Sequence, residues 1–279
     1  MILTNNDYIG YQGVPGAYSE EALITFFGEN NKTIRYDDFE DVIKGVLSEE
    51  IKYGILPIEN SSTGAITSVY DLHKIYNVYI VGEQMIKINH NLLGIKNSFI
   101  SDINEIYSHP QGFEQSSKFL KSHPTWKQIA YFNTAMSASL VNEKQNKSFA
   151  AVASKRAAKI FNLEILAENI NNDSTNTTRF IIIGKHLEKD DEFNKISLLL
   201  RISNEVGSLY GVIKRLADQN INMLKIESRP IEGIPWEYDF FIDIDGNLKD
   251  EQLCHSLSNL EKSAHQIKIL GNYKKGQSL

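Results

Sequence analysis

The chain has 279 residues, 42% hydrophobic and 23% charged, which is typical of a folded protein with room for two domains. Its formal net charge of -6 excludes a general nucleic-acid or anionic-membrane surface, because phosphate binding depends on clustered lysines and arginines. The single cysteine, Cys254, excludes intramolecular disulfides and a cysteine-based zinc cluster. The sequence shows no basic leader and no apolar run of about 18 residues, so we expect a cytoplasmic protein.

The N-terminal part contains two predicted helices, and each is preceded by residues that are typical of a turn or a helix cap. Residues 8–11 form a predicted buried strand, and the glycines and proline of residues 13–16 predict a tight turn before a helix that Ser19 can cap. Such a loop can direct backbone N–H groups at an anion, although a plain packing turn has the same pattern. Asp38 is the predicted cap of a second helix, whose apolar residues recur on one face through Leu47.

A further strand and helix are joined by a polar run. The strand predicted at residues 53–56 leads to five hydrogen-bonding side chains, Glu59 to Thr63, and a helix is predicted to start near Gly64. The positive end of that helix would favour a carboxylate or phosphate. The same side chains could instead only cap the helix, so the pattern leaves both interpretations open.

The chain then crosses into a second lobe, predicted roughly over residues 82–160. The order strand, polar turn, helix recurs there, which predicts a parallel sheet with flanking helices. His109 lies in one of these turns and is either a catalytic group or a turn-stabilising side chain. His90 and His123 have no carboxylate at metal-ligand spacing, so we expect no metal site. The predicted strands are 78–81, 86–88, 106–108, 129–132 and 149–153, and the predicted helices are 113–120, 134–141 and 154–161.

A polar run at residues 171–178 leads directly into an apolar strand. It places Thr178 and Arg179 where a buried strand emerges from a loop, which is where open α/β sheets keep their chemistry. By pattern alone it also fits an ordinary polar loop before a core strand.

The chain turns charged and loses periodicity at residues 186–194, which predicts a linker. We therefore expect one domain over residues 1–185 and another over residues 195–279. The second has the predicted order β-α-β-β-α-β, typical of a ferredoxin-like unit. A unit of this size exposes surfaces that a second copy often covers.

Seven short motifs follow one another along the chain: Gly13-Val14-Pro15-Gly16-Ala17-Tyr18-Ser19, Pro57-Ile58-Glu59-Asn60-Ser61, Ser108-His109-Pro110-Gln111, Ala150-Ala151-Val152-Ala153, Asn176-Thr177-Thr178-Arg179-Phe180, Gly207-Ser208-Leu209 and Ile226-Glu227-Ser228-Arg229-Pro230. Taken together and in this order, they resemble the prephenate dehydratase family in its monofunctional form, with a C-terminal ACT regulatory domain. Ser208 stands where the family commonly has alanine, and Ser116 where a cysteine is common. The chain starts just before the first strand, so we expect no preceding chorismate mutase domain and no mutase activity.

The resemblance implies an α/β fold with a two-lobed catalytic domain like the type II periplasmic binding proteins, followed by the ferredoxin-like ACT domain. The substrate, prephenate, would lie between the lobes and lose carbon dioxide and water to give phenylpyruvate for phenylalanine biosynthesis. No cofactor or metal is implied. The difficult step is the departure of hydroxide, which a positioned hydrogen-bond donor can assist.

The family pattern assigns that donor to Thr178, with His109 as the other candidate. Arg179 could hold a substrate carboxylate through two parallel hydrogen bonds, or could be part of a structural ion pair. Asn60, Ser61 and the first glycine loop would supply neutral donors to a carboxylate. The catalytic candidates are Thr178, Arg179, Asn60, Ser61 and His109, and the substrate-binding candidates are Gly16, Ala17, Tyr18, Ser19, Glu59, Asn176, Thr177 and Phe180.

ACT domains bind an amino acid across a subunit interface, so the resemblance implies L-phenylalanine as a feedback inhibitor and a homo-oligomer, either a dimer or a tetramer. The alternative is a domain that only dimerises. The candidate effector-binding residues are Gly207, Ser208, Leu209, Glu227, Ser228, Arg229 and Pro230.

Two other functions remain open at this point. Arogenate dehydratase would share the motifs around the ring and differ only in the side chain of its substrate. A non-catalytic two-lobed sensor of a small molecule would bind prephenate without turning it over.

Overall fold

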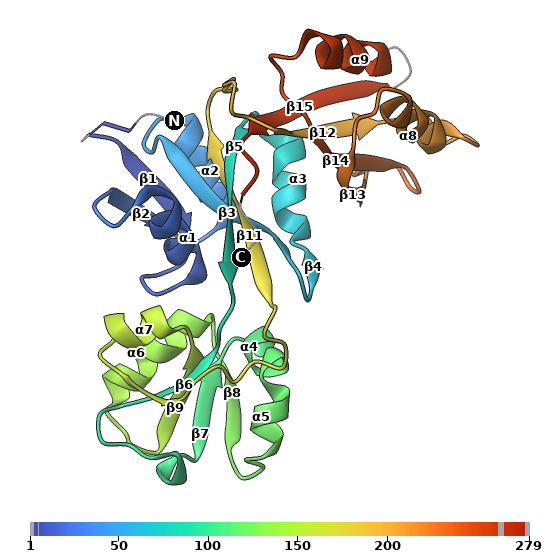
Figure 1. Cartoon of the computed structure of the whole chain (residues 1–279). Coiled ribbons are helices and arrows are strands. Elements are labelled where there is room, and N and C mark those ends of the chain that lie inside the picture. Colours follow the sequence, from blue (N-terminus) through green and yellow to red (C-terminus); the bar gives the residue numbers. More distant parts are fainter. Residues whose placement is uncertain (1–2, 5, 262–264, 277–279) are drawn as a thin grey trace.

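The computed structural model describes residues 3–4, 6–261 and 265–276, so the predicted domain limits at residues 1 and 279 lie outside the described residues. Two α/β lobes and a C-terminal domain follow one another along the chain (Figure 1). This arrangement confirms the predicted fold class of a two-lobed domain followed by a βαββαβ unit.

The first lobe is built on a mixed sheet in the order β2-β1-β3-β11-β5. The strand β11 returns from the second lobe and runs antiparallel to both of its neighbours. Helices cover both faces of the sheet, as its buried central strands β3 and β11 require. The strands are β1 (Tyr8–Gln12), β2 (Lys32–Tyr36), β3 (Tyr53–Asn60), β4 (Gly64–Ala65, paired with β3), β5 (Tyr79–Lys87) and β11 (Thr177–Gly184), and the helices are α1 (Tyr18–Phe27), α2 (Phe39–Leu47) and α3 (Thr67–Ile75).

The second lobe has its own five-stranded sheet in the order β10-β6-β9-β7-β8, with helices on both sides. Its core is rich in alanine, which lets α6 and α7 pack closely on the sheet. The strands are β6 (Asn91–Gly94), β7 (Glu105–Ser108), β8 (Lys127–Ala130), β9 (Phe149–Ala153) and β10 (Glu164–Ala167), and the helices are η1 (Ile100–Asp102), α4 (Pro110–Gln115), α5 (Ser117–Lys121), α6 (Thr134–Lys144) and α7 (Lys155–Ile160).

The chain passes between the lobes twice, once after Lys87 and once between Ala167 and Thr177. The structure therefore places the second lobe a few residues later than residues 82–160. The reason is that β5 stays hydrogen-bonded to β11 through Lys87, while β10 still pairs with β6 at Ala167.

The C-terminal domain has four antiparallel strands in the order β13-β14-β12-β15. Two helices cover one face, and the other face packs on α3, where the rings of Phe241 and Tyr70 meet edge to face. The strand β15 also pairs in parallel with β5 of the first lobe, so one sheet runs through both domains. The elements are β12 (Lys195–Arg201), α8 (Ser208–Asp218), β13 (Met223–Pro230), β14 (Tyr238–Asp245), α9 (Glu251–Glu261) and β15 (Gln266–Tyr273).

Local predictions hold where an element has a strong apolar face. The predicted stripe of α2 is buried, and the helix predicted after Glu59 to Thr63 is present as α3. Its predicted start near Gly64 is wrong, because Gly64 pairs in β4 and α3 starts at Thr67. Ser19 does not cap α1: the turn at Gly16, with φ +88°, lets the helix begin at Tyr18. The strands β2 and β10 were missed, since their partly exposed residues carry no clear apolar pattern.

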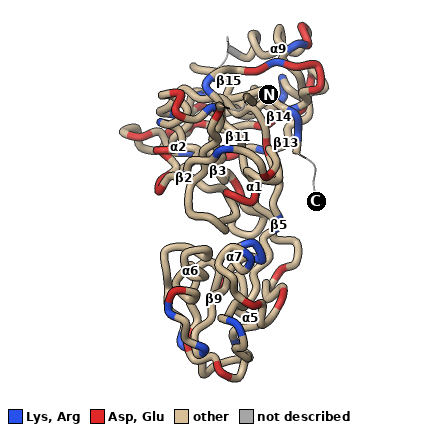
Figure 2. The backbone as a smooth tube through the Cα atoms, turned by 90° about the vertical axis from the view of Figure 1, so that its left-hand side faces the viewer, with Lys and Arg blue, Asp and Glu red and all other residues tan. Residues whose placement is uncertain are grey.

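Charged residues of both signs are interspersed over the two lobes and the C-terminal domain (Figure 2). None of the helices in the described ranges is both long and apolar enough to cross a bilayer.

The buried His73 of α3 makes stability depend on pH. Its side chain is fully buried, and neither ring nitrogen has a hydrogen-bond partner among the described residues. Burial, with a smaller effect of Lys268, lowers its pKa from 6.5 to about 4. A lowered folded-state pKa means that stability is full above pH 6.5 and is lost as pH falls towards 4, by roughly 2–3 kcal/mol at pH 4.5.

We therefore expect His73→Leu to remove this part of the pH dependence. Urea unfolding of the wild type and of His73→Leu at pH 7 and pH 4.5 measures the free energy of unfolding that each protein loses on acidification. Carboxylates that titrate in the same range contribute equally to both proteins, so the difference between the two losses reports on His73. An equal loss of unfolding free energy on acidification in the two proteins would contradict the assignment.

Candidate active site in the interlobe cleft

A cavity of about 440 Å³ lies between the two lobes, and Thr178 forms part of its wall. Because side chains alternate along β11, Thr178 and Phe180 face the cavity while Arg179 points to the other face of the sheet. Helices of the second lobe start at the opposite wall. The polar and aromatic lining residues are Tyr18, Ser19, Asn60, Thr63, His90, His109, Gln111, Gln115, Asn133, Thr134, Thr178 and Phe180.

Asn60 orients the hydroxyl of Thr178. The two residues lie directly opposite each other on β3 and β11, and Asn60 Nδ2 donates a hydrogen bond to Thr178 Oγ1 at 2.9 Å. Asn60 Oδ1 accepts hydrogen bonds from the backbone N–H groups of Ser62 and Thr63 at 2.9 and 3.1 Å, which fixes the amide orientation. The Thr178 hydroxyl is therefore an acceptor towards Asn60, and its own proton is free for another partner.

His109 caps the N-terminus of α4 and also lines the cavity. Its Nδ1 accepts a hydrogen bond from the Gln111 backbone N–H at 3.2 Å, so the proton of the neutral ring is on Nε2. Partial burial lowers the pKa of His109, which keeps the ring neutral at pH 7. His109 can thus stabilise the turn and offer an N–H donor at the same time, the two roles that the sequence left as alternatives.

His90 is a cavity residue that sequence reasoning considered only as a metal ligand. It is almost fully buried at the crossover between the lobes, with Nε2 at 2.9 Å from Gln115 Oε1 and Nδ1 at 3.3 Å from the Tyr18 hydroxyl. Burial lowers its pKa, so this ring is neutral as well. Its place at the crossover between the lobes is the signal in the sequence that points to the cleft.

Several other cavity residues were also missed. Gln111 and Gln115 lie on α4, and Asn133 and Thr134 at the start of α6. Gln111 Nε2 also donates to Thr63 Oγ1 at 3.1 Å, which joins the two lobes at the cleft. Each of these residues lies at or near the start of a helix that follows a strand of the second lobe, which is a position typical of binding residues. The sequence does not show which of these helix starts face the first lobe.

Other predicted residues support the cavity from outside its wall. Ser61 and Thr177 exchange two hydrogen bonds, and Asn176 Oδ1 accepts one from Asn60 at 2.8 Å. Gly16 holds the lobes together, since Ser154 Oγ donates to its carbonyl oxygen at 3.0 Å. Ala17 precedes α1 as its N-cap residue. The cavity wall includes Tyr18 and Ser19 from the predicted glycine loop.

Arg179 and Glu59 lie outside the cavity and pair with each other at 3.1 Å. Arg179 also pairs with Glu83 at 3.2 Å and Asp243 at 2.7 Å. Of the two roles that the sequence left open for Arg179, the structure shows the ion pair.

The predicted effector residues lie in two segments of the C-terminal domain. Gly207, with φ +89°, turns the chain into α8, whose first two residues are Ser208 and Leu209. Glu227, Ser228, Arg229 and Pro230 end β13. Arg229 pairs with Asp71 of α3 at 2.6 Å, so this strand end is attached to the catalytic domain.

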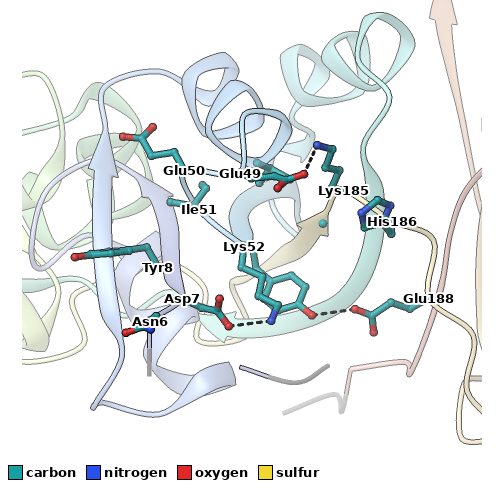
Figure 3. A pocket seen from close by; sticks show the side chains of 13 residues that line it. Asn6, Asp7, Tyr8, Glu49, Glu50, Ile51, Lys52, Lys185, His186 and Glu188 are labelled. Atoms are coloured by element: carbon teal, nitrogen blue, oxygen red, sulfur yellow. Dashed lines mark hydrogen bonds and ion pairs between the residues drawn. The ribbon is translucent and has the colours of Figure 1, made fainter. Parts of the chain in front are cut away.

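A second cavity, of about 360 Å³, lies at the far end of the first lobe (Figure 3). Two ion pairs lie in its wall, Lys52 with Asp7 at 2.8 Å and Lys185 with Glu49, and Glu50 and Glu188 accept hydrogen bonds from tyrosine hydroxyls. The lining comes from residues 6–8, the end of α2 with the loop that follows it, the start of β3, and residues 184–188, and the second lobe does not reach it. We assign no ligand to this cavity, since these charged side chains already have partners.

The fold and the cleft together define a two-lobed α/β protein with a neutral, hydrogen-bonding cleft, joined to a C-terminal βαββαβ domain. The model of the prephenate dehydratase family matches residues 9–188. The chain belongs to this family of hydro-lyases, which act in phenylalanine biosynthesis.

Individual relatives agree over most of the chain. The bifunctional chorismate mutase/prephenate dehydratase of Neisseria gonorrhoeae is 34% identical over 266 residues, which cover 95% of this chain and 74% of that protein. The structure of prephenate dehydratase from Arthrobacter aurescens in complex with L-Phe matches with a TM-score of 0.87 and 25% identity, covering 96% of this chain and 90% of that one. A structure described as a novel type of quorum quenching acylase also matches with a TM-score of 0.87 and 32% identity, covering 96% and 98%.

Proposed function

We propose that the interlobe cleft converts prephenate to phenylpyruvate and that Thr178 is the hydrogen-bond donor to the departing 4-hydroxyl group. The observation that carries this role is the bond from Asn60 Nδ2 to Thr178 Oγ1, which leaves the threonine proton free. Thr178 and Asn60 are both largely buried, so a donor there acts in a water-poor site, where it is most effective.

The reaction balances with one proton. The bond between the ring and its carboxylate breaks and releases carbon dioxide, and its electron pair enters the ring. The bond from the opposite ring carbon to oxygen breaks at the same time, and the hydroxide leaves with its electron pair and takes up a proton to become water. An alcohol is a poor acid at neutral pH, so Thr178 stabilises the departing oxygen or relays the proton instead of giving it up permanently. His109 and His90 are the titratable neighbours for such a relay.

The neutral lining favours prephenate over arogenate. No lysine, arginine, aspartate or glutamate lines this cavity in the described part of the chain. Neutral donors can hold the two carboxylates of prephenate without stabilising the ring carboxylate so strongly that its decarboxylation slows. The ammonium group of arogenate would find no carboxylate partner on this wall, and an unpaired buried charge is costly.

Acylase activity is the second candidate function, because one of the similar structures is described as an acylase. An acylase needs a nucleophile whose proton is taken by a base. The contact seen for the Thr178 hydroxyl is instead an amide donor, which favours donation to a leaving group. We rank acylase activity behind dehydration for this reason.

The C-terminal domain is the proposed site of feedback inhibition by L-phenylalanine, bound by the segments at residues 204–209 and 227–230 between two copies of the chain. Large apolar side chains exposed on this domain support a homo-oligomer: Val206, Tyr210, Ile234 and Trp236. We further propose that the protein works in the cytoplasm.

Purified protein should turn over prephenate with a kcat/KM at least about 10-fold above that for arogenate, because burying an unpaired ammonium group reduces binding. Phenylpyruvate formation measures the reaction of prephenate, and L-phenylalanine formation measures that of arogenate, because the side chain of each substrate is unchanged. Added L-phenylalanine should lower the rate of phenylpyruvate formation. Release of a carboxylic acid from an N-acyl amide substrate is the assay for acylase activity. Turnover of such an amide without turnover of prephenate or arogenate would contradict the proposal.

A further inference from the structure

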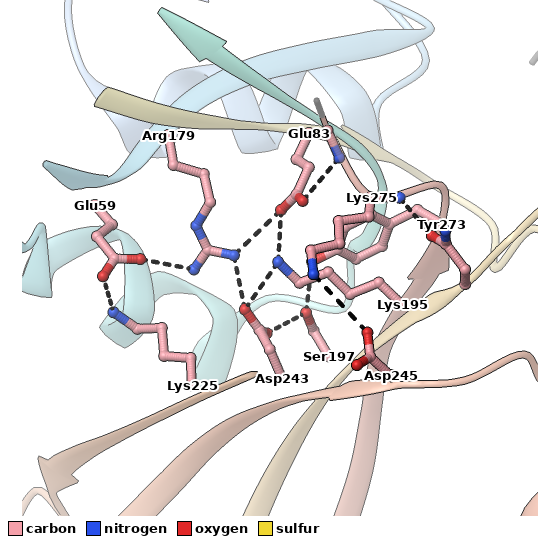
Figure 4. Close-up of polar contacts among 12 residues, drawn as sticks. Glu59, Glu83, Arg179, Lys195, Ser197, Lys225, Asp243, Asp245, Tyr273 and Lys275 are labelled. Carbon is pink, nitrogen blue, oxygen red and sulfur yellow. Dashed lines mark hydrogen bonds and ion pairs between the residues drawn. The ribbon is translucent and has the colours of Figure 1, made fainter. Parts of the chain in front are cut away.

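The residues next to Thr178 and Asn60 in the sequence enter a buried ion network between the catalytic and ACT domains (Figure 4). Arg179 follows Thr178 on β11, and Glu59 precedes Asn60 on β3. Because side chains alternate along a strand, this pair lies on the face of the sheet opposite the cleft. The register pairs Arg179 with Glu59 and Thr178 with Asn60, so the two pairs share one short stretch of backbone.

The network crosses from one domain to the other. Arg179 Nη1 lies 2.7 Å from Asp243 Oδ2 of β14. Lys195 of β12 lies 2.8 Å from Glu83 and 3.3 Å from Asp243. Lys225 of β13 lies 2.7 Å from Glu59, on the side away from Arg179 (Figure 4). Two strands of the ACT domain, β13 and β14, thus pair directly with the two strands that carry the cleft residues, and β12 joins the network through Glu83 of β5 and Asp243.

The closest ion pairs of the network cross the boundary between the domains. Arg179 on the catalytic side pairs with Asp243, and Lys195 and Lys225 on the ACT side pair with Glu83 and Glu59. Within the ACT domain, Lys225 also lies 3.9 Å from Glu227. The Glu83 side chain is fully buried, and those of Arg179 and Lys195 nearly so. A shift of the ACT domain would leave charges buried without partners, which strongly disfavours independent movement of the two domains.

We propose that Arg179 and Glu59 are positioning residues that tie the strands of Thr178 and Asn60 to the ACT domain, so that the docking of this domain sets the geometry of the cleft. The inference rests on the proposed role of Thr178 and extends it. An effector that moves the ACT domain would then act on the donor through β11 and β3, without entering the cleft. Displacements of about 1 Å at reacting groups can change rates by about 10²-fold, so small movements suffice.

Asp243→Asn tests the proposal because it removes one charge of the network from the ACT side and leaves the cleft unaltered. We expect kcat for prephenate to fall about 10-fold with KM changed less than about 2-fold, because the binding groups stay while the donor shifts. Ser197→Ala removes the hydrogen bonds of Ser197 Oγ with Asp243 Oδ1, of 2.6 Å, and with the Tyr273 hydroxyl, of 2.8 Å, but leaves every charge of the network in place, and should lower kcat by less. It keeps the test decisive if Asp243→Asn fails to fold.

Asp239→Asn is the matched control. Asp239 is a buried carboxylate on the same strand and face as Asp243, but it pairs with Arg201 inside the ACT domain, at 2.8 Å. It should lower the melting temperature of the protein while kcat stays within about 2-fold of wild type, since its partner does not touch the catalytic strands.

Two outcomes separate the inference from the proposed function. Equal losses of kcat in Asp243→Asn and Asp239→Asn, or unchanged kcat in Asp243→Asn and Ser197→Ala, overturn the positioning role alone. A wild-type protein without prephenate turnover overturns the proposed function and the inference with it.

Discussion

Thr178→Val should lower kcat for prephenate by about 10²–10³-fold while KM changes little, since a donor aimed at a leaving oxygen acts mainly in the transition state. Valine has nearly the shape of threonine, so the cavity wall keeps its form. The substitution also leaves Asn60 Nδ2 with its bond to Asn176 Oδ1, which limits the structural loss. Steady-state kinetics of phenylpyruvate formation measure both constants.

Thr177→Val is the control for this experiment. Thr177 precedes Thr178 on the same strand, but its hydroxyl donates to the backbone oxygen of Thr175 at 3.0 Å and does not line the cavity. Thr178→Ser, which keeps a hydroxyl, should retain far more activity than Thr178→Val. A rise in KM with unchanged kcat in Thr178→Val would show that the hydroxyl binds the substrate and does not assist the chemistry.

Asn60→Asp should be about as damaging, with a loss of about 10²-fold in kcat/KM. The carboxylate has the size of the amide but cannot donate to Thr178 Oγ1 at 2.9 Å. The threonine would donate its proton to the new carboxylate, and the substrate would lose the donor. The negative charge would also repel a dianionic substrate, so we expect KM to rise as kcat falls.

Asn60→Ser separates these two effects. A serine can donate no hydrogen bond at the reach of the amide, yet it adds no charge. We expect it to lower kcat while KM stays closer to wild type. Wild-type kcat in Asn60→Asp would contradict the role of Asn60 in orienting Thr178, and equal KM values for the two variants would contradict the repulsion.

The local residue pattern determined much of this protein. The apolar stripe of α2 and the β-α-β-β-α-β order of the C-terminal domain follow from periodicity, because each buries one face whatever its neighbours are. The short motifs placed Thr178, Asn60 and His109 in one site through their resemblance to a family, and these three residues do line the cavity.

The tertiary structure decided which face of a strand each motif residue uses and what meets it there. Thr178 and Arg179 are adjacent in one motif, but their side chains lie on opposite faces of the strand, one towards the cleft and the other towards Asp243 of the C-terminal domain. The same holds for Asn60 and Glu59 on β3. His90 lines the cleft because the crossover segment that carries it lies between the two lobes. A single sequence specifies such pairings through contacts between distant segments, and local patterns do not contain them.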